Sequence, residues 1–176
     1  MSEKKYNLSE ILISEQQIAD RVKEMGAQIT KDYNGEPLFL IGILKGSVPF
    51  MADLMRRIDL DVEMDFMSVS SYGGATKTSG VVKILKDLDA DIRGRNVLIV
   101  EDIIDSGLTL AYLKEYLSGR GPKSIKIATF LDKPTGRKAD IQVDYSGFTV
   151  GDQFIVGYGL DVDQKYRNLP FISWIK

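Results

Sequence analysis

The chain has 176 residues and a formal net charge of -2, with 44% hydrophobic and 27% charged residues. This is the composition of an ordinary soluble globular protein, so we expect one domain spanning residues 1–176. The charge excludes the general basic field that would hold nucleic acid or an acidic membrane surface. The N-terminal MSEKKYNLSE lacks the apolar core of a signal peptide, and no apolar run approaches the ~20 residues that span a bilayer, so we expect a cytoplasmic protein.

Cysteine and histidine are both absent. Their absence excludes disulfides, thiolate nucleophiles, zinc sites built from Cys and His, and the side chain most used for proton transfer. Proton transfer therefore falls to Asp, Glu, Lys or Tyr. Any metal must bind to oxygen ligands, which favours Mg²⁺ or another hard cation.

The first part of the chain predicts helices followed by a buried strand. Apolar residues recur at steps of three and four between residues 8 and 33, which is typical of one or two amphipathic helices. Ser14 and Gln17 fit a capping box for the longer helix. The continuous apolar run Leu38–Leu44 predicts a strand covered on both faces, and residues 48–58 predict the helix that follows it.

The rest of the chain repeats this alternation. Strands are expected at residues 62–69, 81–85, 96–100, 124–130 and 153–159, and a helix that begins near residue 108 could be capped at its end by Gly119. Residues 71–80, SYGGATKTSG, are polar and glycine-rich and predict a loop. The pattern predicts an α/β fold with a right-handed, mainly parallel central sheet flanked by helices.

Ligands of such sheets gather at the carboxyl ends of the strands, so the residues just after each apolar run are the candidate site. Four places qualify: Lys45 with Gly46, Glu101 to Thr109, Asp132 with Lys133, and Asp161 to Arg167.

The segment VLIVEDIIDSGLTL, residues 97–110, combines two kinds of chemistry. Its Ser, Gly and Thr residues lie at a predicted helix start, where backbone N–H groups and hydroxyls can surround a phosphate. Its three acids, Glu101, Asp102 and Asp105, would repel a phosphate and need another partner, such as ribose hydroxyls and a divalent cation. A phosphorylated sugar with Mg²⁺ satisfies both halves. The alternative is that Asp105 only caps the helix and that the other two acids are solvated loop charges.

At these residues the sequence resembles the type I phosphoribosyltransferase family. VEDIIDSGLT looks like the phosphoribosyl pyrophosphate signature of its hypoxanthine-guanine branch. LKGS, SYGG, LDKPTGRK and FIVGYGLDVDQKYRNLP occur in the order that this branch shows, and the motifs cover most of the chain after Leu38.

The resemblance implies a fold, an activity and a cofactor. The fold would have a core of about residues 36–150, with a small base-binding hood formed by the N-terminal segment and about residues 151–176. The enzyme would act in purine salvage. It would transfer the 5-phosphoribosyl group of phosphoribosyl pyrophosphate to hypoxanthine or guanine, with Mg²⁺, giving IMP or GMP and pyrophosphate. A homodimer or homotetramer is expected.

The resemblance also implies roles in binding phosphoribosyl pyrophosphate. Glu101 and Asp102 would hold the ribose hydroxyls, and Asp105 would be the catalytic residue that exchanges a proton with N7 of the purine. The loop around the 5-phosphate would consist of Asp105, Ser106, Gly107, Leu108 and Thr109. Ser106 stands where many relatives have Thr and keeps the hydroxyl.

The remaining implied roles concern the base, the metal and the pyrophosphate. Lys133 would donate to O6 of the base, Phe154 would stack on it, and Ile155 would offer backbone hydrogen bonds, whereas a surface lysine and a core aromatic are the simpler interpretations. Asp161 would contact the purine base and bind a second Mg²⁺. Together with Glu101 and Asp102, it completes the set of implied metal ligands. Lys45 and Gly46, joined by a cis peptide, would bind pyrophosphate with Arg167, and Ser71 and Tyr72 would belong to a lid.

A second interpretation is a regulatory protein on the same scaffold that binds RNA or senses a nucleotide without turnover. The counts of 23 basic and 25 acidic residues, with no dense Lys/Arg stripe, argue against RNA binding.

Overall fold

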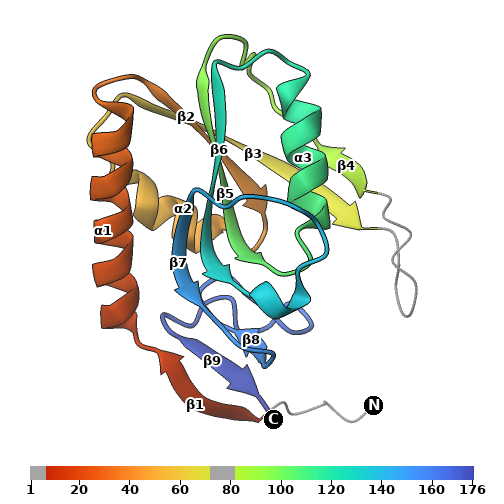
Figure 1. The fold of residues 1–176 in the computed structure, drawn as a ribbon. Coiled ribbons are helices and arrows are strands. Elements are labelled where there is room, and N and C mark those ends of the chain that lie inside the picture. The colour runs from red at the N-terminus through yellow and green to blue at the C-terminus, as the bar shows by residue number, and fades with distance from the viewer. Residues whose placement is uncertain (1–6, 72–81) are drawn as a thin grey trace.

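The computed structural model describes residues 7–71 and 82–176. Within them, one sheet has six strands in the order β4-β3-β2-β5-β6-β7 and a second has three in the order β1-β9-β8 (Figure 1). The larger sheet contains β2 (Leu38–Leu44), β3 (Val62–Ser71), β4 (Val82–Lys86), β5 (Asn96–Ile104), β6 (Ser124–Asp132) and β7 (Tyr145–Thr149). The smaller sheet, which we call the hood sheet, contains β1 (Leu8–Ile13), β8 (Phe154–Val156) and β9 (Ile172–Ile175). The helices are α1 (Glu15–Tyr33), α2 (Val48–Met55) and α3 (Leu108–Ser118), with the 3-10 turn η1 (Pro134–Gly136).

The larger sheet is parallel except for β4, which pairs antiparallel with β3. Two hydrophobic clusters cover its faces, one built with α1 and α2 and the other with α3. Strand β2 serves both because its side chains alternate: Leu38 and Leu40 join the first cluster, and Phe39, Ile41 and Ile43 join the second. The prediction of a mainly parallel α/β sheet flanked by helices is confirmed.

Helix α1 begins at the predicted capping box. Ser14 Oγ accepts from the N–H of Gln17 at 3.2 Å, and Gln17 Oε1 accepts from the N–H of Ser14 at 2.8 Å. The helical prediction for Leu8–Ile13 is wrong, because these residues form β1 and pair with β9 from the other end of the chain. Strand β9 supplies the backbone hydrogen bonds that make these residues a strand, and the local sequence pattern does not reveal a partner so distant in the chain.

The strand predicted at residues 153–159 is shorter than expected and belongs to the hood sheet. Only Phe154–Val156 is a strand, and it pairs with β9 in the hood sheet instead of joining the parallel sheet. Gly157 and Gly159 both have a positive φ and turn the chain directly after it. Strands β7 and β9 were not predicted. Figure 1 shows β5, β6 and β7 running toward the hood sheet, which lies beyond their carboxyl ends.

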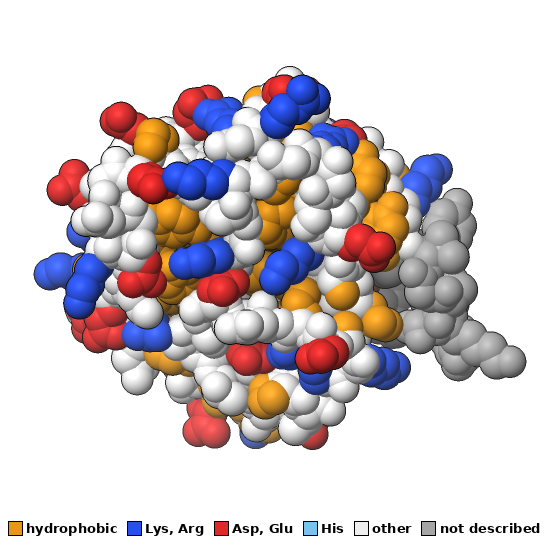
Figure 2. Space-filling view, turned by 45° about the horizontal axis from the view of Figure 1, so that its top comes forward, with side chains coloured by type: hydrophobic (Ala, Val, Ile, Leu, Met, Phe, Trp, Pro, Cys, Tyr) orange, Lys and Arg blue, Asp and Glu red, His pale blue; other side chains and the backbone are white. Residues whose placement is uncertain are grey.

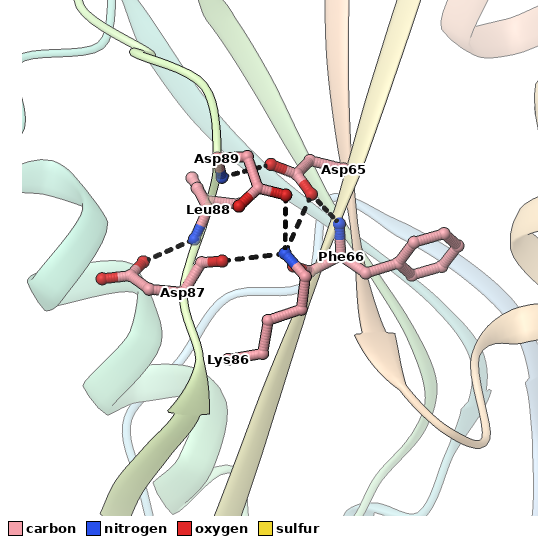
Figure 3. Close-up of polar contacts among 6 residues, drawn as sticks. All are labelled: Asp65, Phe66, Lys86, Asp87, Leu88 and Asp89. Atoms are coloured by element: carbon pink, nitrogen blue, oxygen red, sulfur yellow. Dashed lines mark hydrogen bonds and ion pairs between the residues drawn. The ribbon is translucent and has the colours of Figure 1, made fainter.

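The base of the β3–β4 pair holds a compact polar cluster (Figure 3). Lys86 Nζ donates to the carboxylates of Asp65 at 3.3 Å and Asp89 at 3.2 Å, and to the backbone carbonyls of Phe66 and Asp87.

Residues 72–81, which connect the two strands and include the predicted lid residue Tyr72, lie outside the described residues. The other lid residue, Ser71, is the last residue of β3.

In the described part of the chain, no helix has both the length and the apolar character needed to cross a membrane.

Candidate active site

The acid pair lies inside a strand, because β5 continues to Ile104, four residues beyond the predicted end at residue 100. The extension follows from pairing with β6, in which Glu101 stands opposite Thr129. Glu101 is 9% exposed as a result. The interpretation of Glu101 and Asp102 as solvated loop charges is therefore wrong.

The two carboxylates oppose each other electrostatically. Burial raises the pKa of Glu101, and the charge of Asp102 raises it further. Burial also raises the pKa of Asp102, although the Arg167 guanidinium acts against this rise. Two carboxylates with raised pKa values favour partners that donate hydrogen bonds or carry positive charge.

The loop after β2 packs directly on this pair. An ideal Cβ on Gly46 would lie 1.5 Å from Asp102 Oδ2, so a side chain at this position would force the Asp102 carboxylate to move. The cis peptide joins Leu44 and Lys45, so the expectation of a cis bond between Lys45 and Gly46 is wrong by one position. The physical requirement at Gly46 is this close approach to the carboxylate.

The phosphate half of the site lies at the start of α3. The N-cap is Gly107, with φ 75°, so the alternative that Asp105 caps the helix is wrong. The first N–H groups of a helix have no intrahelical partner and can bind an anion. They adjoin a cavity of about 240 Å³ that the acid pair also lines. Its lining residues are Ile43, Val69, Glu101, Asp102, Ile103, Ile104, Asp105, Ser106, Gly107, Thr109 and Leu110.

The backbone of Lys133 is hydrogen-bonded to Ile104, a residue that lines this cavity, because β6 ends next to β5. Its backbone N–H donates to the Ile104 carbonyl at 2.9 Å, and its Nζ lies 3.5 Å from the carbonyl oxygen of Asp152 in the segment before β8. Phe154 begins β8 and is 58% exposed, whereas Ile155 is buried. The interpretation of Phe154 as a core aromatic is therefore wrong, and its ring is available for a ligand.

Arg167 and Asp161 form an ion pair of 2.8 Å in the turn between β8 and β9. Gln164, to which the sequence assigned no individual role, accepts from both Arg167 and Lys45 at 3.3 Å, so the turn contacts the loop after β2. Arg167 Nε is buried without a hydrogen-bond partner. The four predicted strand ends therefore meet in one region.

The predicted metal ligands do not gather by themselves. Among the residues that the structure describes, no three acids are grouped so that they could hold a metal ion, and Asp161 pairs with Arg167 instead of joining Glu101 and Asp102. The acid pair, with its raised pKa values, still fits a cation that takes its remaining ligands from oxygens of a bound substrate.

Comparison with known proteins identifies the family. A family model described as "Phosphoribosyl transferase domain" matches residues 9–163. The chain belongs to the phosphoribosyltransferase family. It is 58% identical, over 98% of its length and 96% of the relative's, to the hypoxanthine-guanine phosphoribosyltransferase of Bacillus subtilis. It is also 51% identical to "Bifunctional protein TilS/HprT" of Listeria monocytogenes over 97% of this chain, but it spans only 26% of that protein.

Solved structures of this family agree in fold. A crystal structure of a hypoxanthine-guanine phosphoribosyltransferase from Bacillus anthracis, with a HEPES molecule in its active site, matches with a TM-score of 0.93 at 52% identity. The match covers 97% of this chain and 100% of that one. The resemblance seen in the sequence motifs, to the hypoxanthine-guanine branch of the family, is confirmed.

Proposed function

We propose that this enzyme transfers the 5-phosphoribosyl group of phosphoribosyl pyrophosphate to hypoxanthine or guanine, giving IMP or GMP and pyrophosphate, in purine salvage. Near full-length relatives with that activity in their names support this, at 58% and 54% identity. The observation that carries it is the single cavity in which the acid pair and the amide groups at the start of α3 meet. A pentose carrying a phosphate is the ligand that uses both halves.

In the proposed binding mode, Glu101 and Asp102 accept from the ribose hydroxyls, and the loop of residues 105–109 surrounds the 5-phosphate with amide and hydroxyl donors. Lys45, Gly46 and Arg167 bind the pyrophosphate. The planar guanidinium of Arg167 suits this task, because it can donate two parallel hydrogen bonds to phosphate oxygens.

The base would lie between Phe154, which stacks on it, and Lys133, which donates to O6, while Ile155 offers backbone hydrogen bonds. An ammonium is only a donor, so it pairs with a 6-oxo group and faces another donor in adenine. Asp105 exchanges the N7 proton as N9 attacks the anomeric carbon, and the bond from that carbon to pyrophosphate breaks. Ser71 and Tyr72 belong to the segment that we propose excludes water.

Glu101 and Asp102 would hold one Mg²⁺, and Asp161 would hold a second one. The metal would supply positive charge for the departing pyrophosphate. The chain itself contributes the acid pair and the substrate contacts that hold the ribose in place. The cytoplasmic location and the dimeric or tetrameric state stay predictions.

The test is an activity assay with phosphoribosyl pyrophosphate, Mg²⁺ and a panel of hypoxanthine, guanine, xanthine, adenine and uracil. We expect nucleotide products from hypoxanthine and guanine and very little from adenine, because the Lys133 ammonium donates a hydrogen bond to a 6-oxo group. Equal rates with adenine would remove Lys133 from that role. Absence of product with both hypoxanthine and guanine would refute the function.

The alternative of an RNA-binding regulator has less support. The relatives are named as transferases, and the face in Figure 2 interleaves basic and acidic side chains with no basic stripe. RNA held by phosphate contacts would show strong salt dependence in filter binding, and we expect no such binding at physiological salt.

A further inference from the structure

Arg137 lies between two strand ends that carry proposed site residues. Its Nε donates to the backbone carbonyl of Asp105 at 3.1 Å, and its Nη2 forms an ion pair with the carboxylate of Asp132. The side chains of Arg137 and Asp132 are 22% and 23% exposed, so their ion pair is partly shielded from water, whereas the hydrogen bond to the Asp105 carbonyl is exposed. The guanidinium thus joins the residue that follows β5 to the last residue of β6.

This link begins where the sheet ends. The β5–β6 pairing stops at Ile104 and Asp132, and the hydrogen bond from the N–H of Lys133 to Ile104 is its last. Beyond it, the backbone N–H groups of residues 138–139 donate to the Ser106 carbonyl at 2.9 and 3.0 Å. The guanidinium of Arg137 and these two amides therefore hold the segments together after the strand ladder has ended.

The neighbour of Arg137 also contacts the Asp105 side chain. An ideal Cβ on Gly136 would lie 1.6 Å from Asp105 Oδ1, so the carboxylate rests directly against the backbone of the turn. Hence the segment that begins with Lys133 supports both the carbonyl and the carboxylate of Asp105.

A 6-oxopurine presents O6 and N7 side by side on one edge, at a fixed spacing. If Lys133 meets O6 and Asp105 meets N7, as the proposed function requires, the ammonium and the carboxylate must be held at a matching spacing. We propose that Arg137 is a positioning residue that sets this spacing by tying the two segments together. A planar guanidinium can bond a carbonyl and a carboxylate at once in fixed directions, which a lysine ammonium does less well.

The test compares Arg137→Met and Arg137→Ala with the wild-type enzyme. We expect kcat/KM for hypoxanthine to fall about 100-fold, because a misplacement of about 1 Å costs roughly this much. The KM for phosphoribosyl pyrophosphate should stay within about threefold, because the proposed ribose contacts come from β5 and the N–H groups of residues 138–139 still hold the phosphate loop at the Ser106 carbonyl. Added guanidinium ion should restore part of the kcat/KM of Arg137→Ala and should not stimulate the wild-type enzyme.

Arg120→Met is the matched control. Arg120 Nη2 pairs with Asp87 at 31% exposure, away from the cavity, so its loss should leave both kinetic constants unchanged. If Arg137→Met does not fold, as judged by circular dichroism, Asp132→Asn offers a second test, because it removes the negative charge with which Arg137 pairs. It should reduce kcat/KM for hypoxanthine without changing the KM for phosphoribosyl pyrophosphate.

The positioning role is overturned if kcat/KM for hypoxanthine stays within about twofold of wild type. It is overturned as well if the KM for phosphoribosyl pyrophosphate rises by the same factor by which kcat/KM for hypoxanthine falls. It is also overturned if guanidinium ion restores nothing to Arg137→Ala. A wild-type chain without activity on hypoxanthine or guanine would instead refute the proposed function, and the role of Arg137 with it, so the two failures are distinguishable.

Discussion

The Asp105 carboxylate does not cap the helix that follows, since the N-cap is Gly107. We predict that Asp105→Asn lowers kcat by a factor of about 100 or more, because general acid-base catalysis typically contributes this much. The fold and the affinity for phosphoribosyl pyrophosphate should be retained, because the amide keeps the shape of the carboxylate. Steady-state kinetics and a binding titration measure the two effects, and near-normal turnover would remove Asp105 from the proposed role.

Glu101 lies in a place that favours the neutral form of its carboxyl group. Because burial and Asp102 raise its pKa, the ionised pair costs folding free energy when no ligand is bound. We predict that Glu101→Gln raises the unfolding temperature by about 2–4 °C, the shift that about 1 kcal/mol produces in a chain of this size. Thermal unfolding without ligand measures it.

The same substitution should weaken the binding of phosphoribosyl pyrophosphate, since the proposed ribose contact of Glu101 would be lost. Glu115→Gln is a suitable control, because Glu115 is exposed on α3 and should leave both quantities unchanged. An unfolding temperature lowered by Glu101→Gln would show that the charge stabilises the strand.

At the scale of elements, Asp65 anchors the base of the β3–β4 pair. Burial alone would raise the pKa of Asp65, but hydrogen bonds from the N–H groups of Asp89 and Phe66 and from Lys86 lower it overall from 3.8. A lowered folded-state pKa gives stability that is present above the unfolded value and is lost as the pH falls through the folded value. The ionised Asp65 therefore stabilises the fold at neutral pH.

We predict that Asp65→Asn lowers the unfolding temperature at pH 7 by about 4 °C, as expected for the loss of a charge-assisted hydrogen bond. The difference from wild type should shrink as the pH falls below 3.8 and through the lower pKa of the folded protein, because the wild-type carboxylate becomes protonated over that range. Asp89→Asn should have a smaller effect, since that side chain is 86% exposed. A difference independent of pH would contradict the electrostatic origin.

At the scale of the whole molecule, ligand binding should stabilise the fold, because in the proposed binding mode the substrate and Mg²⁺ would bridge segments from β2, β5, β6 and the hood sheet. At a ligand concentration about 100 times the dissociation constant, binding contributes about 2.7 kcal/mol. We predict a rise of about 5–10 °C in the unfolding temperature with phosphoribosyl pyrophosphate and Mg²⁺ together.

This rise should be reduced when Mg²⁺ is removed with a chelator, since the acid pair then faces the substrate without a cation. Pyrophosphate added with Mg²⁺ tests the proposed pyrophosphate contacts of Lys45, Gly46 and Arg167 separately from those to the ribose. An equal rise with and without Mg²⁺ would argue against a cation at Glu101 and Asp102.

The sequence alone was sufficient where the signal is local. The strand Leu38–Leu44 was predicted with its observed bounds, and the Ser14 capping box marks the start of α1. Continuous apolar runs and side-chain capping depend on residues within a few positions of each other, so a single segment contains the necessary information. The grouping of the site residues at strand ends was also predictable, because parallel strands bring their carboxyl ends to one edge.

Other features were decided only by the tertiary structure, because their partners are distant in the chain. Strand β1 exists because β9 pairs with it, and Glu101 is buried because β6 extends β5. Arg137 stood inside a recognised motif, but its link between Asp105 and Asp132 becomes visible only when two strand ends lie together. Hydrogen bonds between distant segments, and the burial of side chains where those segments meet, depend on tertiary packing. A local sequence pattern does not carry that information.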